Sequence, residues 1–490
     1  MKNIKKLTSL LLALVMVMAM TMSVFAADIE ITGGAEKSEY SAWRLLNATD
    51  GGEGKFAYTV NDKYEDVLSN DVVDYLNNNK DNATVIRGFA DEMYAKVKDM
   101  DPDAVTSNGT FTGVEQGYYL IAETKAGNAE DTLSLVMLDT AGKDKVTVET
   151  KEDAPELVKK VKETNDSTGV TSDWQDGADY DIGDTVPFKL TGTVSEKYDS
   201  YKTYYYAFHD KMSAGLSFDA DSVVVKVDGK EVNDEYYDVK TTELAHTDCT
   251  FEVVFENLKD IDSVNVNSKI TVEFNALLTG ENVVVGTPGN PNEAKLEYNN
   301  NPYYEGDGKP EETGETPWDK VVVFTYVLNA DKVDGDGNKL EGAGFTLYKF
   351  DNAKNDYAPV GDEITGVTTF TFNGLDAGKY KLVETKVPAG YNQADDIEFT
   401  IEATYDTDVA EPELLTLVVK DAKENVISEG EEAVFSTVVT AGSVNTDIEN
   451  LTGAELPETG GVGTTMFYVI GAILMVGAAV VMITRKRMSR

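Results

Sequence analysis

The feature that most constrains the fold is a succession of short runs rich in β-branched residues, for example residues 223–227, 270–274 and 415–419. These runs are separated by Gly, Asn and Asp residues, a pattern typical of β-strands joined by tight turns. The sequence therefore predicts a mainly β protein built from tandem immunoglobulin-like β-sandwich domains.

One segment departs from this pattern. Between Asp71 and Lys98, apolar residues recur at the spacing of a helix face, and they are Val72, Tyr75, Leu76, Val85, Phe89, Met93 and Val97. A repeat of this period indicates amphipathic helix. We therefore expect the N-terminal domain to carry one or two inserted helices.

The N-terminus has the three-part layout of a secretory signal peptide: Lys2, Lys5 and Lys6 precede an apolar run over residues 10–20 and then Ala26. This layout predicts a signal peptide over residues 1–26, removed after Ala26. The apolar run is too short to span a bilayer core, which takes roughly 20 residues.

The C-terminus carries a second processing signal over residues 454–490. An apolar stretch, predicted to span the membrane over residues 466–483, is followed by a basic tail, and it is preceded by the pentapeptide Leu456, Pro457, Glu458, Thr459 and Gly460. The positive tail holds such a segment with its end in the cytoplasm, so the pentapeptide faces outward. A simple membrane anchor explains the apolar stretch but not the pentapeptide.

This ending resembles the cell-wall sorting signal of Gram-positive surface proteins. The resemblance implies that a sortase cuts between Thr459 and Gly460 and passes the threonine acyl group to an amine. It further implies an extracellular protein, covalently anchored to the peptidoglycan of the cell wall.

The net charge and the cysteine count limit which partners the chain can bind and which covalent bonds can stabilise it. The net charge of −44 makes nucleic acid an unfavourable partner and suits a soluble extracellular surface. The single cysteine, Cys249, excludes a disulfide within the chain, and a buried core role is favoured over a reactive thiol. Any covalent stabilisation must therefore use other side chains.

Turn and linker residues gather at two places, residues 150–155 and 299–317. The predicted division is an N-terminal domain (27–153), a second domain (154–304), a linker (305–317) and a third domain (318–453). Residues 110–125 also match residues 371–386 at a constant offset. Two copies this far apart indicate related sandwich domains in place of a solenoid.

The third domain contains the stretches 339–347 and 380–391, the second of which includes Val383-Glu384-Thr385-Lys386. Together they resemble the CnaB-type domain of pilins and surface adhesins, whose E-box matches the second stretch. The resemblance implies an intramolecular isopeptide bond between Lys332 and Asn450, promoted by Glu384. Lys320 is the alternative lysine.

The chemistry of such a trio follows from burial. A buried lysine has a lowered pKa and becomes a neutral nucleophile, while a buried carboxyl has a raised pKa and keeps its proton. That proton can polarise the asparagine amide and then leave with ammonia.

The second domain resembles the CnaA-like, isopeptide-forming type through residues 157–161, 207–218 and 294–302. The resemblance implies a trio of Lys159, Asp210 and Asn300, with Asp210 as the promoting acid. The neighbouring residues Lys160, Asn299 and Asn301 remain alternatives. His209, beside Asp210, is expected to be structural.

In the first domain, the repeat supplies the E-box-like Glu123, and Lys37 lies early enough to be a partner. No clear asparagine completes a trio, so we predict no bond there. The domain ends in Val146-Thr147-Val148-Glu149-Thr150-Lys151, which is similar to the pilin motif although Glu149 and Thr150 replace its Tyr-Pro pair. Lys151 is therefore the predicted pilin-motif lysine.

Taken together, these resemblances imply a backbone pilin of a Gram-positive bacterium, joined by sortase between Thr459 and Lys151 of the next subunit. The partners implied are pilus-specific and housekeeping sortases, further copies of the chain, minor pilins and peptidoglycan. The alternative is a minor pilin or a monomeric wall-anchored adhesin; a surface enzyme would need a catalytic constellation that the sequence lacks. No cofactor is expected, and no metal, because residues 334–338 begin like a calcium-binding loop but Lys339 stands where its glycine is needed.

Overall fold

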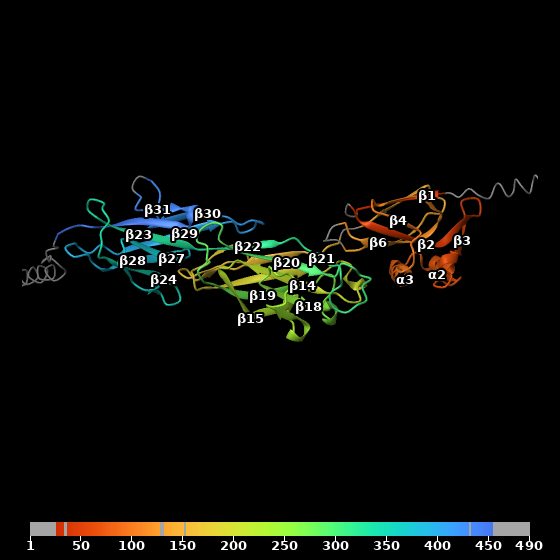
Figure 1. Cartoon of the computed structure of the whole chain (residues 1–490), viewed down its shortest axis with the longest axis horizontal. Helices are drawn as coiled ribbons and strands as arrows, with labels where there is room; N and C mark the ends of the chain where they lie inside the picture. The colour runs from red at the N-terminus through yellow and green to blue at the C-terminus, as the bar shows by residue number, and fades with distance from the viewer. Residues whose placement is uncertain (1–25, 34–36, 128–131, 151–152, 431–432, 454–490) are drawn as a thin grey trace, which may run out of the picture. The chain divides into compact units, whose positions relative to one another are not determined.

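The computed structural model describes residues 26–33, 37–127, 132–150, 153–430 and 433–453 (Figure 1). Residues 1–25 of the predicted signal peptide, Lys151 and the sorting pentapeptide lie outside these residues. None of the helices described is long and apolar enough to cross a membrane, and the predicted span over residues 466–483 also lies outside them.

The first domain contains two sheets. One has the strand order β5-β1-β8, with β1 (Ala26–Thr32), β5 (Thr110–Glu115) and β8 (Lys145–Glu149). The other has the order β3-β2-β6-β7, with β4 beside β2; its strands are β2 (Glu39–Asp50), β3 (Phe56–Val60), β4 (Ala104–Thr106), β6 (Gly117–Lys125) and β7 (Leu135–Asp139).

The two inserted helices predicted for this domain are confirmed as α2 (Val72–Asn79) and α3 (Ala83–Val97). The side chain of Asn82 caps α3 by accepting a hydrogen bond from the backbone N–H of Val85, at 3.2 Å. The apolar face of the helices packs against the larger sheet, in a core that includes Trp43, Leu76, Phe89, Met93 and Leu120.

The second domain is a sandwich of two sheets. The larger has the order β12-β22-β20-β14-β18-β17 with β21 beside β20, and the smaller has the order β16-β15-β19-β13-β9. The strands are β9 (Leu157–Val161), β12 (Gly177–Asp179), β13 (Thr185–Thr193), β14 (Tyr206–Met212), β15 (Leu216–Val227), β16 (Lys230–Glu231), β17 (Asp238–Lys240), β18 (Phe251–Phe255), β19 (Lys269–Leu278), β20 (Asn290–Tyr298), β21 (Gly314–Glu315) and β22 (Asp319–Phe324).

The third domain is also a sandwich. One sheet has the order β27-β23-β32-β31, and the other has the order β25-β24-β28-β29-β30 with β26 beside β24. The strands are β23 (Tyr326–Asp334), β24 (Gly344–Asp351), β25 (Asp356–Pro359), β26 (Ile364–Thr365), β27 (Thr369–Leu375), β28 (Gly378–Lys386), β29 (Ile397–Tyr405), β30 (Leu414–Lys420), β31 (Phe435–Val438) and β32 (Ser443–Asn450). The predicted β-sandwich class is thus confirmed.

Short elements complete the described residues. A small hairpin joins β10 (Thr164–Asn165) to β11 (Val170–Thr171). The 3₁₀ helices are η1 (Asp62–Tyr64), η2 (Tyr198–Ser200), η3 (Asp234–Tyr236), η4 (Leu258–Asp260) and η5 (Val439–Ala441).

The boundary between the second and third domains lies later than the sequence suggested. Strand β22 pairs with β20 and β12, and β21 pairs with β20, so both complete the larger sheet of the second domain. The compact unit containing this domain includes Thr171–Thr325 without a break, together with Thr404–Leu415. The linker predicted at 305–317 and the third-domain start predicted at 318 therefore fall inside the second domain.

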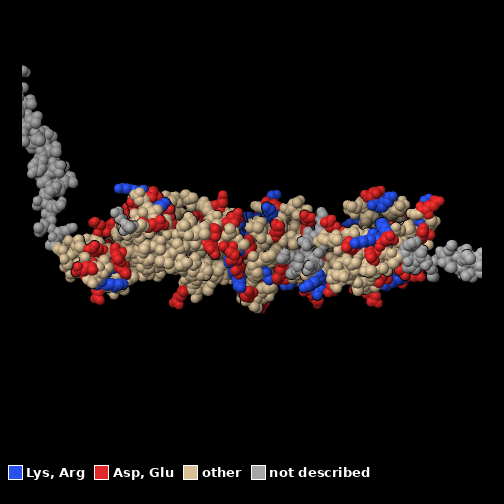
Figure 2. Space-filling view, turned by 90° about the horizontal axis from the view of Figure 1, so that it is seen from above, with Lys and Arg blue, Asp and Glu red and all other residues tan. Residues whose placement is uncertain are grey.

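Side chains alternate between the two faces of each strand, and this alternation positions the residues of interest. On β14, Tyr206 and Phe208 belong to the core between the two sheets, and Asp210 continues that face. His209 points to the other face. On the side of the molecule drawn in Figure 2, acidic side chains are spread among basic ones, and the described residues gather into no broad basic patch there.

Candidate functional site

Lys159 lies wholly inside the second domain, with 0% of its surface exposed. It belongs to β9 and faces the core beside Val161. Its Nζ forms an ion pair with the carboxylate of Asp210, which is equally buried. The same nitrogen lies 5.5 Å from the ring centre of Phe188 and 5.2 Å from that of Phe274, so aromatic walls surround the amine.

Burial changes the protonation of this pair. Loss of hydration lowers the pKa of the Lys159 amine, although the attraction of Asp210 opposes the change. Loss of hydration likewise raises the pKa of the Asp210 carboxyl to about 6, against the attraction of Lys159. Both shifts favour an uncharged amine beside a protonated acid, which is the state in which lysine is nucleophilic.

A third polar side chain, Asn292, completes this site. Asn292 is fully buried on β20, where it pairs with Met212, two residues from Asp210 on β14. Its amide interacts with the Asp210 carboxyl and opposes the rise in the pKa of that group. Among the described residues, neither amide atom of Asn292 has a hydrogen-bond partner of normal geometry. A buried amide without hydrogen-bond partners costs folding free energy. Its position beside the Lys159 amine therefore suggests a chemical role for Asn292.

The predicted partner, Asn300, does not lie beside this pair. Ala294 is the residue of β20 opposite Asp210, and Asn300 lies beyond the end of that strand. At a rise of about 3.3 Å per residue, six residues of extended chain separate Asn300 from this position by roughly 20 Å. The alternative Asn299 is engaged elsewhere, since its amide donates to the carbonyl of Thr203 at 3.1 Å.

The alternative lysine also points elsewhere. Lys160 follows Lys159 on the strand, so its side chain leaves from the opposite face. Its Nζ lies 2.6 Å from the Oδ1 of Asp176. The structure therefore brings together Lys159, Asp210 and Asn292, whereas the sequence pointed to Asn300.

In the third domain, Lys332 lies on β23 and is also 0% exposed. Its Nζ donates hydrogen bonds to the backbone carbonyls of Ile448, at 2.6 Å, and Val333, at 3.2 Å. Burial lowers the pKa of this amine, and the nearby carboxylates of Glu384 and Glu449 oppose the change. This lysine thus has an acid nearby but no direct ion pair with it.

Asn450 and Glu384 lie next to this amine. Strands β23 and β32 are parallel neighbours in which Lys332 pairs with Ile448 and Asp334 with Asn450, so Lys332 and Asn450 lie close on one face. The Asn450 amide nitrogen donates to Glu384 Oε1 at 2.9 Å, and the backbone N–H of Ala394 donates to Glu384 Oε2 at 2.8 Å. All three residues of the predicted trio therefore meet in one buried cluster.

The first domain shows no such trio within its described residues, because Glu123 is buried on β6 whereas Lys37 is exposed. Burial raises the pKa of the Cys249 thiol to about 12, which keeps it protonated and unreactive. Lys151 and the pentapeptide 456–460 lie outside the described residues.

Comparison with known proteins agrees with this architecture. Residues 327–412 match the family described as SpaA, a prealbumin-like fold domain, and residues 451–489 match the LPXTG cell wall anchor motif. The chain is 27% identical to the trypsin-resistant surface T6 protein of Streptococcus pyogenes serotype M6 over 394 residues, covering 69% of this chain and 70% of that protein. These similarities fit a sortase-assembled backbone pilin.

Two solved pilin structures match this chain. The T6 backbone pilin of Streptococcus pyogenes, which has a modular three-domain structure, superposes with a TM-score of 0.56 at 18% identity, over 88% of this chain and 100% of that one. The full-length major pilin SpaD of Corynebacterium diphtheriae gives a TM-score of 0.49 at 18% identity, over 88% and 98% of the two chains. The first match supports the sandwich fold of this pilin-like chain, and the anchor motif supports its attachment to the cell wall.

Proposed function

We propose that this chain is the shaft subunit of a covalently polymerised cell-surface pilus, strengthened by two self-formed isopeptide bonds. The observation that carries the proposal is that each of two sandwich domains buries one lysine completely, beside a carboxyl and an asparagine. Buried lysines are rare in ordinary domains, because an uncompensated ammonium is costly away from water. The presence of two such sites in one wall-anchored chain supports the same chemistry, formation of an isopeptide bond, at both.

In the second domain, the proposed reaction joins Lys159 to Asn292. The neutral Nζ attacks the amide carbon of Asn292, while the protonated Asp210 carboxyl donates a hydrogen bond to that amide. A new Nζ–C bond forms, the bond to the amide nitrogen breaks, and ammonia leaves with the proton that Asp210 supplies. Asp210 then takes a proton from Nζ, so the acid is regenerated.

In the third domain, the proposed bond joins Lys332 to Asn450, with Glu384 in the role of the acid. The hydrogen bonds from the Asn450 amide to Glu384 support this role, because they hold the leaving nitrogen against the carboxyl. In both domains, folding fixes the amine against the amide, which corresponds to an effective molarity of about 10⁵ M or more. No external enzyme is then needed for these bonds.

Assembly into a fibre uses the two signals outside the described residues. A sortase cleaves after Thr459, and the amine of Lys151 in another copy attacks the resulting acyl-enzyme. Repetition of this step gives a head-to-tail polymer, whose base is passed to peptidoglycan and which minor pilins can join. The chain itself is a structural protein and a sortase substrate.

Intact mass tests the internal bonds directly. For a chain spanning residues 27–459, we expect a mass about 34 Da below the sequence value, since each bond releases one ammonia of about 17 Da. A deficit of about 17 Da would leave one domain unbonded, and no deficit would refute both bonds.

Polymerisation needs a separate measurement in the native host. Extracts of the cell wall should contain a ladder of high-mass species that survives boiling in detergent, and Lys151→Ala should remove it. Lys145→Ala is a matched control, because Lys145 is a nearby exposed lysine on β8. Persistence of the ladder in the Lys151 variant would overturn the assigned acceptor, and absence of any ladder in the wild type would favour a monomeric adhesin.

A further inference from the structure

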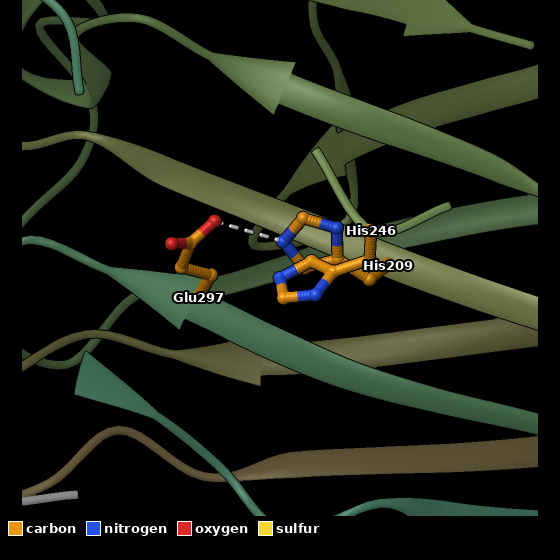
Figure 3. A group of neighbouring side chains, drawn as sticks. All are labelled: His209, His246 and Glu297. Carbon is orange, nitrogen blue, oxygen red and sulfur yellow. Dashed lines mark hydrogen bonds and ion pairs between the residues drawn. The ribbon is translucent and has the colours of Figure 1, made fainter. Parts of the chain in front are cut away.

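The only two histidines of the chain lie together in the second domain. His209 comes from β14, on the face away from the core, and His246 comes from the segment between β17 and β18. Their ring centres are 4.5 Å apart and the rings are nearly perpendicular, at 80°. Figure 3 shows both rings beside the carboxylate of Glu297, which projects from β20.

The donor atoms of these three residues converge. One ligand atom from each of His209, His246 and Glu297 lies within 4.8 Å of the others. His209 Nε2 is 3.1 Å from Glu297 Oε2. Outside this group of three, a further carboxylate lies next to His246, whose Nε2 is 3.2 Å from Oε1 of Glu315, on β21. Two imidazoles and two carboxylates form a set that suits Zn²⁺.

Three of the four proposed ligands also contact a second side chain that orients them. His209 Nδ1 lies 3.0 Å from Glu252 Oε1, which leaves Nε2 as the ligand nitrogen. Glu297 Oε1 is held by the Lys309 ammonium at 2.6 Å, and Glu315 Oε2 by the Lys295 ammonium at 2.7 Å. Outer partners of this kind orient the ligands of metal sites and are part of their design.

The charges of the cluster are balanced before a metal binds. The carboxylates of Glu252, Glu297 and Glu315 face the ammonium groups of Lys295 and Lys309 and the ring of His209, which holds a hydrogen toward Glu252 and another toward Glu297. A divalent cation that displaces the hydrogen on Nε2 therefore adds one positive charge among three carboxylates, and two of its four ligands, His209 and Glu297, are buried.

From this geometry we propose that His209, His246, Glu297 and Glu315 form a structural zinc site on the outer face of the second domain. The hydrogen shared by His209 Nε2 and Glu297 is released to solvent when the metal binds. Zinc ligands at about 2.0–2.1 Å from the ion lie about 3.3 Å apart at tetrahedral angles. The donors of His209 and Glu297 are already 3.1 Å apart and those of His246 and Glu315 3.2 Å apart, so only the wider separations must close, by up to about 1.5 Å within the group of three. His246 and Glu315 are partly exposed, so their side chains can make this movement and the ion can reach the site from solvent beside them.

The ion would link four segments that are distant in sequence. It would join β14 and β20 to the segment before β18 and to β21, which pairs with β20 in the same sheet. The site lies on the face of β14 opposite to Asp210, so it is separate from the proposed isopeptide bond and does not depend on it.

The test uses the purified chain spanning residues 27–459, freed of metal by a chelator. Titration with Zn²⁺ alone should give one bound ion per chain and a rise of a few degrees in melting temperature, since a ligand that binds only the folded state stabilises it. Co²⁺ should give the intense visible absorption of a tetrahedral site. No binding to the wild-type chain would overturn the proposal.

Matched variants identify the ligands. His246→Ala should weaken Zn²⁺ binding at least tenfold and abolish the Co²⁺ absorption, while the melting temperature without metal stays close to that of the wild type, because His246 is partly exposed. Glu256→Gln changes a carboxylate of the same domain outside the site and should leave binding unchanged. Equal affinity in the wild type and the His246 variant would place the ion elsewhere and refute this site.

Discussion

The second and third domains use the same three kinds of side chain but distribute them differently over their sheets. In the second domain, Lys159 lies on the smaller sheet, while Asp210 and Asn292 lie on the larger one. In the third domain, Lys332 and Asn450 lie on neighbouring parallel strands of one sheet, and Glu384 projects from the other. A bond in the second domain therefore ties two sheets together, whereas a bond in the third ties two strands.

The state of the lysine differs as well. Lys159 depends on a fully buried ion pair with Asp210. Lys332 instead donates to two backbone carbonyls, and its acid is held by Asn450 and by the N–H of Ala394. Asp210 therefore has two roles, as the acid of the proposed reaction and as the counter-charge of Lys159. Glu384 has only the first of these roles.

The largest difference should follow removal of the two acids. Asp210→Ala should abolish the bond of its domain, worth about 4–5 kcal/mol for a closed loop of this length. It should also leave Lys159 buried without its counter-charge, a further cost of roughly 3–5 kcal/mol. Glu384→Ala should lose only the free energy that the isopeptide bond contributes, because the backbone carbonyls that accept hydrogen bonds from Lys332 remain. Urea unfolding followed by domain-specific proteolysis measures both effects.

Intact mass of the same two variants provides the control, since each should lack one ammonia loss and not two. Equal destabilisation of the two domains would contradict the distinction drawn between the two acids. A full mass deficit in either variant would show that the carboxyl is dispensable for bond formation.

The next largest effect separates the two asparagines of the second domain. Asn292→Ala should halve the mass deficit to about 17 Da and lower the free energy of unfolding by about 4–5 kcal/mol. Asn300→Ala should leave the full deficit, because Asn300 lies beyond the end of β20, far from Lys159. The reverse result would restore the residue expected from sequence and remove Asn292 from the proposed site.

The sequence predicted the sandwich class and both helices because these depend on local patterns. Residues 71–98 repeat at helical spacing whatever the rest of the chain does, and α2 and α3 formed there. The trio of the third domain, Lys332, Glu384 and Asn450, was assembled from a motif that fixes the strands on which these residues lie. The structure brings them together, although the bond itself stays a prediction.

Asn292 was missed because register between distant strands is not a local property. Asn300 was preferred for its place at the end of the domain, as Asn450 is in the third. One signal was available: Asn292 heads the alternating series Ala294, Leu296 and Tyr298, so it is a polar residue on an apolar strand face. The boundary at 318 failed for a related reason, since only the pairing of β22 with β20 assigns that strand to the second domain.

A pH dependence should distinguish the two bonds kinetically. The Asp210 carboxyl has a pKa raised to about 6, and the neighbouring amine has a lowered pKa. Lys159 and Asp210 titrate as a pair in two steps, and between these steps the pair holds one titratable proton. The reactive form, a neutral amine beside a protonated carboxyl, is one arrangement of that proton. Below pH 6 a second proton binds to the pair, and the doubly protonated pair contains a charged amine, so bond formation in the second domain should slow about tenfold per pH unit.

Mass spectrometry of the Glu384→Ala variant during refolding isolates the second domain, because this variant forms no bond in the third. Samples refolded at pH 7.5 should lose ammonia faster than samples refolded at pH 5. A rate that is constant over this range would show that proton sharing between Lys159 and Asp210 does not control the reaction.

The smallest effect should come from Lys320, the alternative lysine for the third domain. Lys320 lies on β22, a strand of the second domain, and its ammonium pairs with the exposed carboxylate of Glu411. An ion pair open to solvent contributes about 0–1 kcal/mol, so Lys320→Ala should barely change stability and should keep the full mass deficit. Lys332→Ala, its matched partner, should lose one ammonia release. If the Lys320 variant lost it instead, the third domain would draw its lysine from a neighbouring domain, and the contrast between a bond across sheets and a bond within one sheet would fail.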